Sequence, residues 1–207
     1  MRSKLTSELV ERALLEKVWD VGNRVLYDLC AANSKHTRDD VIIAKVLLIG
    51  RTYAAAIERR RDKGDAVGDA FYETKVAPQI RSSDIDRWFR ALDNGSNEDI
   101  ALNLETHKRV MELFTKISGL EKRSLASKYL HFHFPERFYI YDSRAYKAIS
   151  ELTKPVGRSL PSLREHDDVY ARFSLRCLNL NGQIDSLVGR RLSPREFDKV
   201  LLAYSRP

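Results

Sequence analysis

Apolar side chains recur three and four positions apart through most of this chain, and this spacing restricts the fold to packed helices. The first such pattern runs from Thr6 to about Ala32, with apolar positions at Leu9, Ala13, Leu14, Val18, Val21, Val25, Leu26 and Leu29. A second helix is expected from Thr37 or Asp39 to about Arg61, and its first half is apolar on nearly every side. This second helix should therefore be central and buried.

The same spacing predicts further helices over residues 71–80, 83–93, 97–117, 122–134, 143–152, 162–180 and 193–205. Ser162 with Glu165, and Ser193 with Glu196, are typical of capping boxes, and Asn181-Gly182 is expected to end the helix between them. Only Phe138–Tyr141 resembles a short strand. The predicted fold class is all-α, as one domain over residues 1–207 or as two helical lobes around a cleft.

Length and composition limit the class of protein. Of 207 residues, 43% are hydrophobic and 31% are charged, which is enough for a buried core under a charged surface. The longest apolar block, Val41 to Ile49, is interrupted by Lys45 and is far shorter than the ~20 residues of a membrane helix. No signal-peptide pattern follows Met1. We therefore expect a cytoplasmic protein without a membrane partner.

The two cysteines, Cys30 and Cys177, lie in apolar helical patterns with no Cys or His at metal-ligand spacing. They are interpreted as reduced core thiols, and a cluster held by four cysteines is excluded. No metal or cofactor is predicted.

The net charge of +7 favours a polyanionic partner, and nucleic acid comes first among these. The basic residues are spread along the chain rather than collected in a tail. Arg59–Arg61 is typical of a solvated helix end. Arg51 is embedded between apolar turns, so its guanidinium should have a carboxylate or phosphate partner.

The stretch from Ser124 to Tyr146 combines an apolar helix, a turn at Pro135, an extended run and a helix start. Lys128 lies in the helix, and Asp142, 14 positions later, is placed to cap the next one. A lysine amine beside a carboxylate in an apolar setting is one way to build a nucleophile. The same residues also fit an ordinary helical hairpin with a capping aspartate.

A helix projection at ~100° per residue places Lys128 at the border of the aromatic face. Partial burial there would lower the pKa of the amine and favour its neutral, nucleophilic form. The alternative, which composition alone favours, is a side chain that reaches solvent. The same projection predicts an open position for His131 and a core position for His133, while His107 is expected to be exposed on its own helix.

Gly119 to Ile149 resembles the core of the helix–hairpin–helix DNA glycosylase superfamily, especially its 8-oxoguanine glycosylase-like branch. Ser118-Gly119-Leu120-Glu121-Lys122 matches the hairpin, with one glycine where the family usually has two, and Tyr139 to Arg144 matches the segment that bears the aspartate. The resemblance implies excision of a modified base by a lysine that attacks the sugar, assisted by Asp142. Lys128 is the preferred nucleophile. Lys122, 20 positions before Asp142, is the rival.

The same resemblance implies duplex DNA as the partner. Gly119, Lys122 and Arg123 would contact phosphate, and the substrate would be contacted by Tyr129, His131, Phe132, Tyr141 and Arg144. Two other functions remain open at this point: a non-catalytic helical DNA-binding protein, and a defence-system module whose basic surface is incidental.

Overall fold

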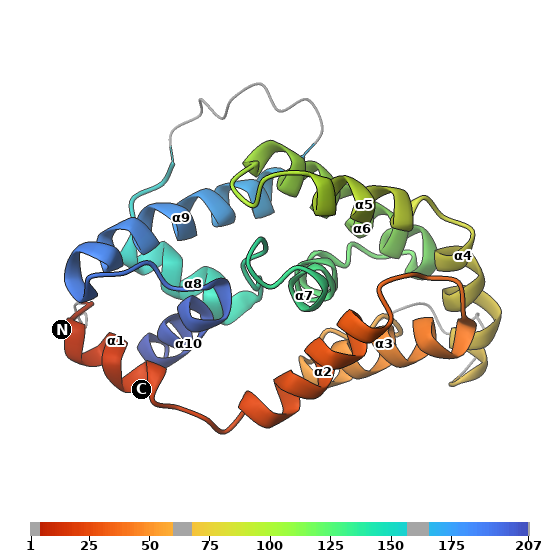
Figure 1. Ribbon diagram of the computed structural model, residues 1–207, viewed down its shortest axis with the longest axis horizontal. Coiled ribbons are helices and arrows are strands. Elements are labelled where there is room, and N and C mark those ends of the chain that lie inside the picture. Colours follow the sequence, from red (N-terminus) through yellow and green to blue (C-terminus); the bar gives the residue numbers. More distant parts are fainter. Residues whose placement is uncertain (1–4, 60–67, 157–165, 207) are drawn as a thin grey trace.

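The computed structural model describes residues 5–59, 68–156 and 166–206, and every regular element in these ranges is helical (Figure 1). The elements are α1 (Ser7–Leu14), α2 (Asp20–Ala32), α3 (Asp39–Thr52), the π-helical turn η1 (Tyr72–Val76), α4 (Ala77–Arg81), α5 (Ile85–Asn94), α6 (Ile100–Ser118), α7 (Arg123–His133), α8 (Ser143–Leu152), α9 (Asp168–Val188) and α10 (Pro194–Tyr204). The all-α prediction is confirmed for this part of the chain. No helix within it is both long enough and apolar enough to cross a bilayer.

α7 lies in the middle of the molecule, and the other helices surround it (Figure 1). It packs against α2, α3 and α6, and all its residues from Leu125 to Phe132 are buried. An α-helix buried on all sides is unusual for a chain this small, because most helices keep one face in water. Each polar residue of α7 must therefore find a partner inside the protein.

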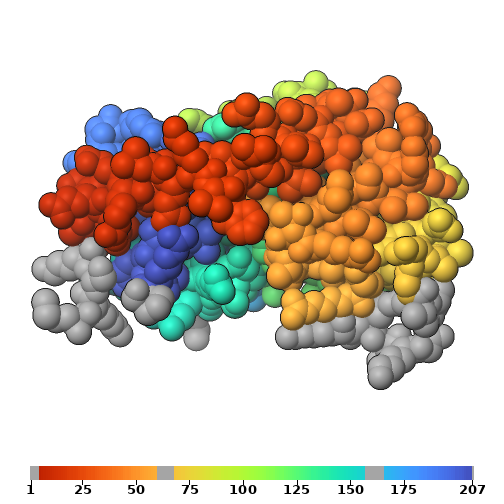
Figure 2. Space-filling view, turned by 90° about the horizontal axis from the view of Figure 1, so that it is seen from below, coloured from red at the N-terminus to blue at the C-terminus, as the bar shows by residue number. Residues whose placement is uncertain are grey.

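The predicted helix from Thr6 to Ala32 is two helices. α1 packs against α9 and α10, whereas α2 packs against α3 and α7, so the chain turns between them to reach two different sets of partners. The connection leaves Leu15 and Val18 exposed, although Val18 fits the predicted helical period. In Figure 2, α1, this connection and α2 form one band across a face on which α3, α8 and α10 are also visible.

α3 is central, as predicted, but ends at Thr52 rather than near Arg61. Gly50 allows the chain to fold back at this end, because a Cβ there would lie 3.0 Å from Cα of Ala56. Arg51 pairs with Glu58 at 3.3 Å, which confirms the predicted carboxylate partner. Residues 60 and 61 of the predicted helix end lie outside the described ranges.

The helix predicted over residues 162–180 differs from α9 at both ends, because His166 and Asp167 are not helical and α9 begins at Asp168. The capping box of Ser193 and Glu196 at the start of α10 is confirmed. The box predicted at Ser162 and Glu165 lies outside the described residues. α9 runs through Asn181-Gly182 to a C-cap at Gly189, because the Asn181 side chain is buried and bonds the backbone of Leu192 instead of ending the helix.

Candidate functional site

Lys128 is fully buried in α7, with a side chain only 1% exposed. Its Nζ donates to Ser124 Oγ at 2.8 Å and to the Tyr141 carbonyl at 3.4 Å. The same atom lies 3.6 Å from Asp142 Oδ2. The alternative in which Lys128 reaches solvent is therefore wrong, and the predicted lysine and aspartate are neighbours.

The chain after α7 folds back along that helix, and this return path brings Asp142 to Lys128. The Nδ1–H of His131 donates to the Phe138 carbonyl at 2.9 Å. Three residues further on, the Tyr141 N–H donates to Ser127 Oγ at 3.0 Å. The prediction of a strand over Phe138–Tyr141 is wrong, because this segment has no regular secondary structure. In these two bonds its backbone pairs with side chains of α7 and not with another strand.

Asp142 has two roles that use different oxygens. Oδ1 accepts the N–H groups of Arg144 at 3.0 Å and Ala145 at 2.9 Å, which confirms the predicted N-cap of α8. Oδ2 faces Lys128. Because the cap fixes the carboxylate, the charge beside the amine is held in place.

The electrostatic setting of Lys128 lowers the pKa of its amine. Burial lowers the pKa of the amine, and the attraction of Asp142 and Asp198 only partly opposes this effect. The Tyr53 ring centroid lies 5.8 Å from Nζ and covers another side of the amine.

Asp198 is the site residue that the sequence reasoning missed. It lies on α10, is 3% exposed, and receives an ion pair from Arg195 Nη1 at 2.5 Å. Its pKa is raised to about 6, because burial and the nearby charge of Asp142 together outweigh the lowering effects of Arg195 and Lys128. The signal was an Arg-x-x-Asp pair on an otherwise apolar face of a helix, where a carboxylate must have a partner.

Two tyrosines pack against the aromatic side chains of α7. Tyr27 and Tyr53 pack on Phe132, with ring centroids 4.8 and 5.3 Å from its ring. The Tyr53 hydroxyl donates to Asn23 Oδ1 at 2.6 Å. The Tyr27 hydroxyl donates to Nε2 of His131 at 2.6 Å, since the other ring nitrogen carries the proton given to Phe138.

The residues expected to contact the substrate do not form one surface. Phe132 packs on Tyr53, the ring that lies beside the Lys128 amine. Tyr129 lies in the core, where its hydroxyl bonds His36 Nε2 at 2.7 Å. His131 is 0% exposed, so its predicted open position is wrong. Tyr141 is half-buried beside Asp142, and Arg144 is exposed at the start of α8.

His107 was also expected on the surface, and this prediction is wrong. It is 0% exposed and stacks on Tyr170, with ring centroids 3.6 Å apart and planes 8° apart. The helical period placed it on the polar side of α6, but α9 covers that side with an aromatic ring.

α6 and α7 form a helical hairpin joined by residues 119–122, with Gly119 in the left-handed region at φ +73°. Lys122 is 9% exposed, and its Nζ donates to the Arg59 carbonyl at 2.8 Å. Arg123 is paired with Asp167, which is 6% exposed, and with Glu121. Both cations predicted to contact phosphate are thus engaged inside the protein.

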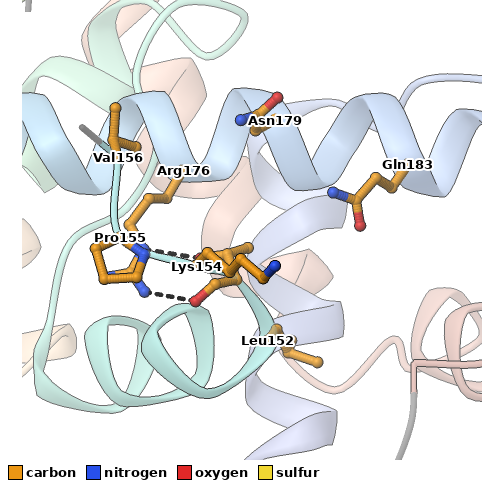
Figure 3. Close-up of a pocket in the computed structure, with 8 residues that line it drawn as sticks. Leu152, Lys154, Pro155, Val156, Arg176, Asn179 and Gln183 are labelled. Atoms are coloured by element: carbon orange, nitrogen blue, oxygen red, sulfur yellow. Dashed lines mark hydrogen bonds between the residues drawn. The ribbon is translucent and has the colours of Figure 1, made fainter. Parts of the chain in front are cut away.

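A separate cavity of about 370 Å³ lies between the end of α8 and α9, and none of the residues around Lys128 lines it (Figure 3). Arg176 crosses it and donates to the side chain and the carbonyl of Thr153, each at 2.8 Å. The cavity is lined by Leu152, Thr153, Lys154, Pro155, Val156, Arg176, Asn179 and Gln183. Arg176 thus links α9 to the C-terminal end of α8.

Cys30 and Cys177 are both buried, free thiols. Burial raises the pKa of the Cys30 thiol to about 12, so it is not a reactive thiolate at neutral pH. Comparison of the chain with protein-family models, with curated proteins and with solved structures found no match.

Proposed function

We propose that this protein is a DNA glycosylase with AP-lyase activity, which excises a modified, 8-oxoguanine-like base through Lys128 and Asp142. The observation that carries the proposal is the 3.6 Å approach of Lys128 Nζ to Asp142 Oδ2 in a buried setting. The depressed pKa of the lysine and the fixed carboxylate supply a nucleophile and a counter-charge, the two groups that displacement of a base requires.

In the proposed reaction the neutral amine of Lys128 attacks the sugar carbon that carries the base. A new carbon–nitrogen bond forms as the glycosidic bond breaks, and the base leaves with the electron pair and takes up a proton. The attacking nitrogen loses a proton, and opening of the sugar ring then gives a Schiff base. Asp142 stabilises the positive charge that develops on the sugar.

The amine is covered in the present conformation, so substrate access requires movement. Asp142 is 30% exposed while Lys128 beneath it is 1% exposed. A flipped nucleotide therefore reaches Nζ only after the side chains over it shift, as is usual for enzymes that act on extruded bases.

Lys122, the rival nucleophile, is used elsewhere. Its ammonium donates to the carbonyls of Ala56 and Arg59, so it holds the segment that follows α3. These contacts give Lys122 a structural role. This arrangement supports Lys128 for the attack.

Borohydride trapping tests the proposal. Duplexes that contain an abasic site or 8-oxoguanine should form a covalent adduct with the wild type, and Lys128→Ala should form none. Lys147→Ala, an exposed lysine on α8, is the matched control and should trap like the wild type. No adduct with the wild type, or an undiminished adduct with Lys128→Ala, would contradict the proposal. Tight, salt-sensitive duplex binding without any excision would instead identify a non-catalytic DNA-binding protein.

A further inference from the structure

Three buried polar atoms near Lys128 have no hydrogen-bond partner among the described residues. They are Asn23 Nδ2 on α2, and Arg195 Nε and Asp198 Oδ1 on α10. Asn23 and Asp198 are each 3% exposed. A buried donor or acceptor without a partner costs ~1–3 kcal/mol, so three of them in one region require a reason.

We term these three residues the polar wall. Arg195 and Asp198 are joined by their ion pair. Asn23 is joined to Tyr53 by a hydrogen bond, and the Tyr53 ring covers Lys128.

Electrostatics agree with this placement. Burial raises the pKa of Tyr53 to about 12, and Arg195 and Asp198 are both close enough to shift it, in opposite directions. Asp198 likewise acts on the pKa of Lys128. The three residues of the polar wall thus all lie close to Tyr53, whose ring lies beside the amine.

The unused atoms define what could satisfy them. Asn23 Nδ2 and Arg195 Nε are donors, and Asp198 Oδ1 is an acceptor. A complementary ligand presents two acceptors and one N–H. The edge of 8-oxoguanine that carries two carbonyl oxygens around an N–H has this pattern, and so does the imide edge of uracil. Unmodified guanine offers only acceptors, N7 and O6, on the corresponding edge.

We infer that the polar wall reads the target base, and that it selects bases in which an N–H lies between two carbonyl groups. The inference rests on the proposed function and adds the feature by which the substrate is recognised. Asp198 would discriminate most strongly, because its carboxylate attracts an N–H and repels the lone pair of an unmodified ring nitrogen. Tyr27 and Tyr53 supply aromatic surface beside the wall on which the ring could stack.

The test compares two readouts on the same protein. Release of the base from duplexes that contain 8-oxoguanine or uracil depends on base recognition, whereas borohydride trapping at a base-free site does not. Asp198→Asn should lower the ratio of base release to trapping at least tenfold. Asn23→Asp, which keeps the oxygen that accepts from Tyr53 and replaces the unused donor by an acceptor, should lower the same ratio. Glu105→Gln, in a half-buried ion pair with Arg109, is the matched control and should keep the wild-type ratio.

The outcomes separate the two proposals. Unchanged ratios in folded Asp198→Asn and Asn23→Asp, with thermal midpoints checked for each, would overturn the role of the polar wall and leave the proposed function in place. Wild-type protein that neither releases a base nor traps would overturn both. If Asp198→Asn does not fold, Asn23→Asp alone decides, because it leaves the Arg195–Asp198 ion pair in place.

Discussion

Two lysines of the α6–α7 hairpin, six positions apart, have opposite surroundings. The Lys122 ammonium donates to two backbone carbonyls of the segment after α3. Lys128 meets one hydroxyl, one distant carbonyl and a carboxylate 3.6 Å away, in a site where burial dominates and the pKa falls. The two residues are therefore suited to different tasks: Lys122 to holding the chain and Lys128 to reacting.

The rate of Schiff-base formation should report the lowered pKa of Lys128. For an amine that must be neutral to react, the single-turnover trapping rate rises with pH and levels off near the pKa. We expect it to level off clearly below pH 10.5, the ordinary value for lysine, because burial disfavours the ammonium. A rate that keeps rising in proportion to hydroxide through pH 10.5 would contradict the assignment.

Buried histidines should make the protein sensitive to acid. Burial lowers the pKa values of His36 and His131 to about 4 and of His107 to about 3. Between these values and the ordinary 6.5, the unfolded chain binds more protons than the folded one, so stability falls as pH drops through this window. Asp198, with its pKa raised to about 6, acts in the opposite direction between pH 3.8 and 6 but is a single group.

Urea unfolding at pH 7 and pH 4.5 measures the net effect. We expect the free energy of unfolding to be lower at pH 4.5 by at least about 2 kcal/mol, from shifts worth ~1.4 kcal/mol per pKa unit. For His131→Gln, the free energy of unfolding should differ less between the two pH values than it does for the wild type. Equal stability at the two pH values would show that the histidines are not buried in the neutral form.

At the scale of the element, the cap of α8 can be separated from the charge at the site. Asp142→Asn keeps a side-chain oxygen for the Arg144 and Ala145 N–H groups but removes the carboxylate, whereas Asp142→Ala removes both. We expect Asp142→Ala to lose ~1 kcal/mol of stability and Asp142→Asn to lose less. Both should reduce base excision at least tenfold.

Thermal or urea unfolding together with excision rates checks this prediction. If Asp142→Asn excises the base as fast as the wild type, the carboxylate has only the structural role of a cap. If the two variants are equally stable, the cap contributes nothing measurable to α8.

Helix ends that depend on residues nearby in the sequence were predictable. Helix ends that depend on packing against distant helices were not. The caps at Asp142 and Ser193 use residues two or three positions away, so the sequence shows them directly. The break between α1 and α2 has no such signal, because Val18 continues the apolar period and only the different partners of the two helices require a turn. The same holds for Gly182, a glycine that α9 passes through.

The candidate site shows the same division at the scale of the whole molecule. Lys128 and Asp142 are near in sequence, and their pairing was predicted from one helix, one turn and one return segment. Asn23, Tyr53 and Asp198 come from α2, the end of α3 and α10, which are far apart in the sequence and approach Lys128 only in the folded chain. A helix projection uses only the residues of one helix, so it places Lys128 at the border of the aromatic face. The burial of Lys128 involves distant residues that such a projection does not include.

The whole-molecule charge of +7 predicts salt-dependent binding to DNA. Each phosphate neutralised contributes a slope of about −0.9 to a plot of log affinity against log salt concentration. We expect a slope of about −3 or steeper for duplex DNA, from fluorescence anisotropy between ~50 and ~200 mM salt. A slope near zero would show that the basic surface does not meet phosphate, and would favour a partner other than nucleic acid.

The central claim is that Lys128 is the residue that attacks the sugar. The most direct measurement is mass-spectrometric mapping of the borohydride-trapped adduct after proteolysis. The predicted result is a single modified peptide with the sugar remnant on Lys128. A remnant on Lys122 or on another lysine, or no modified peptide at all, would contradict it.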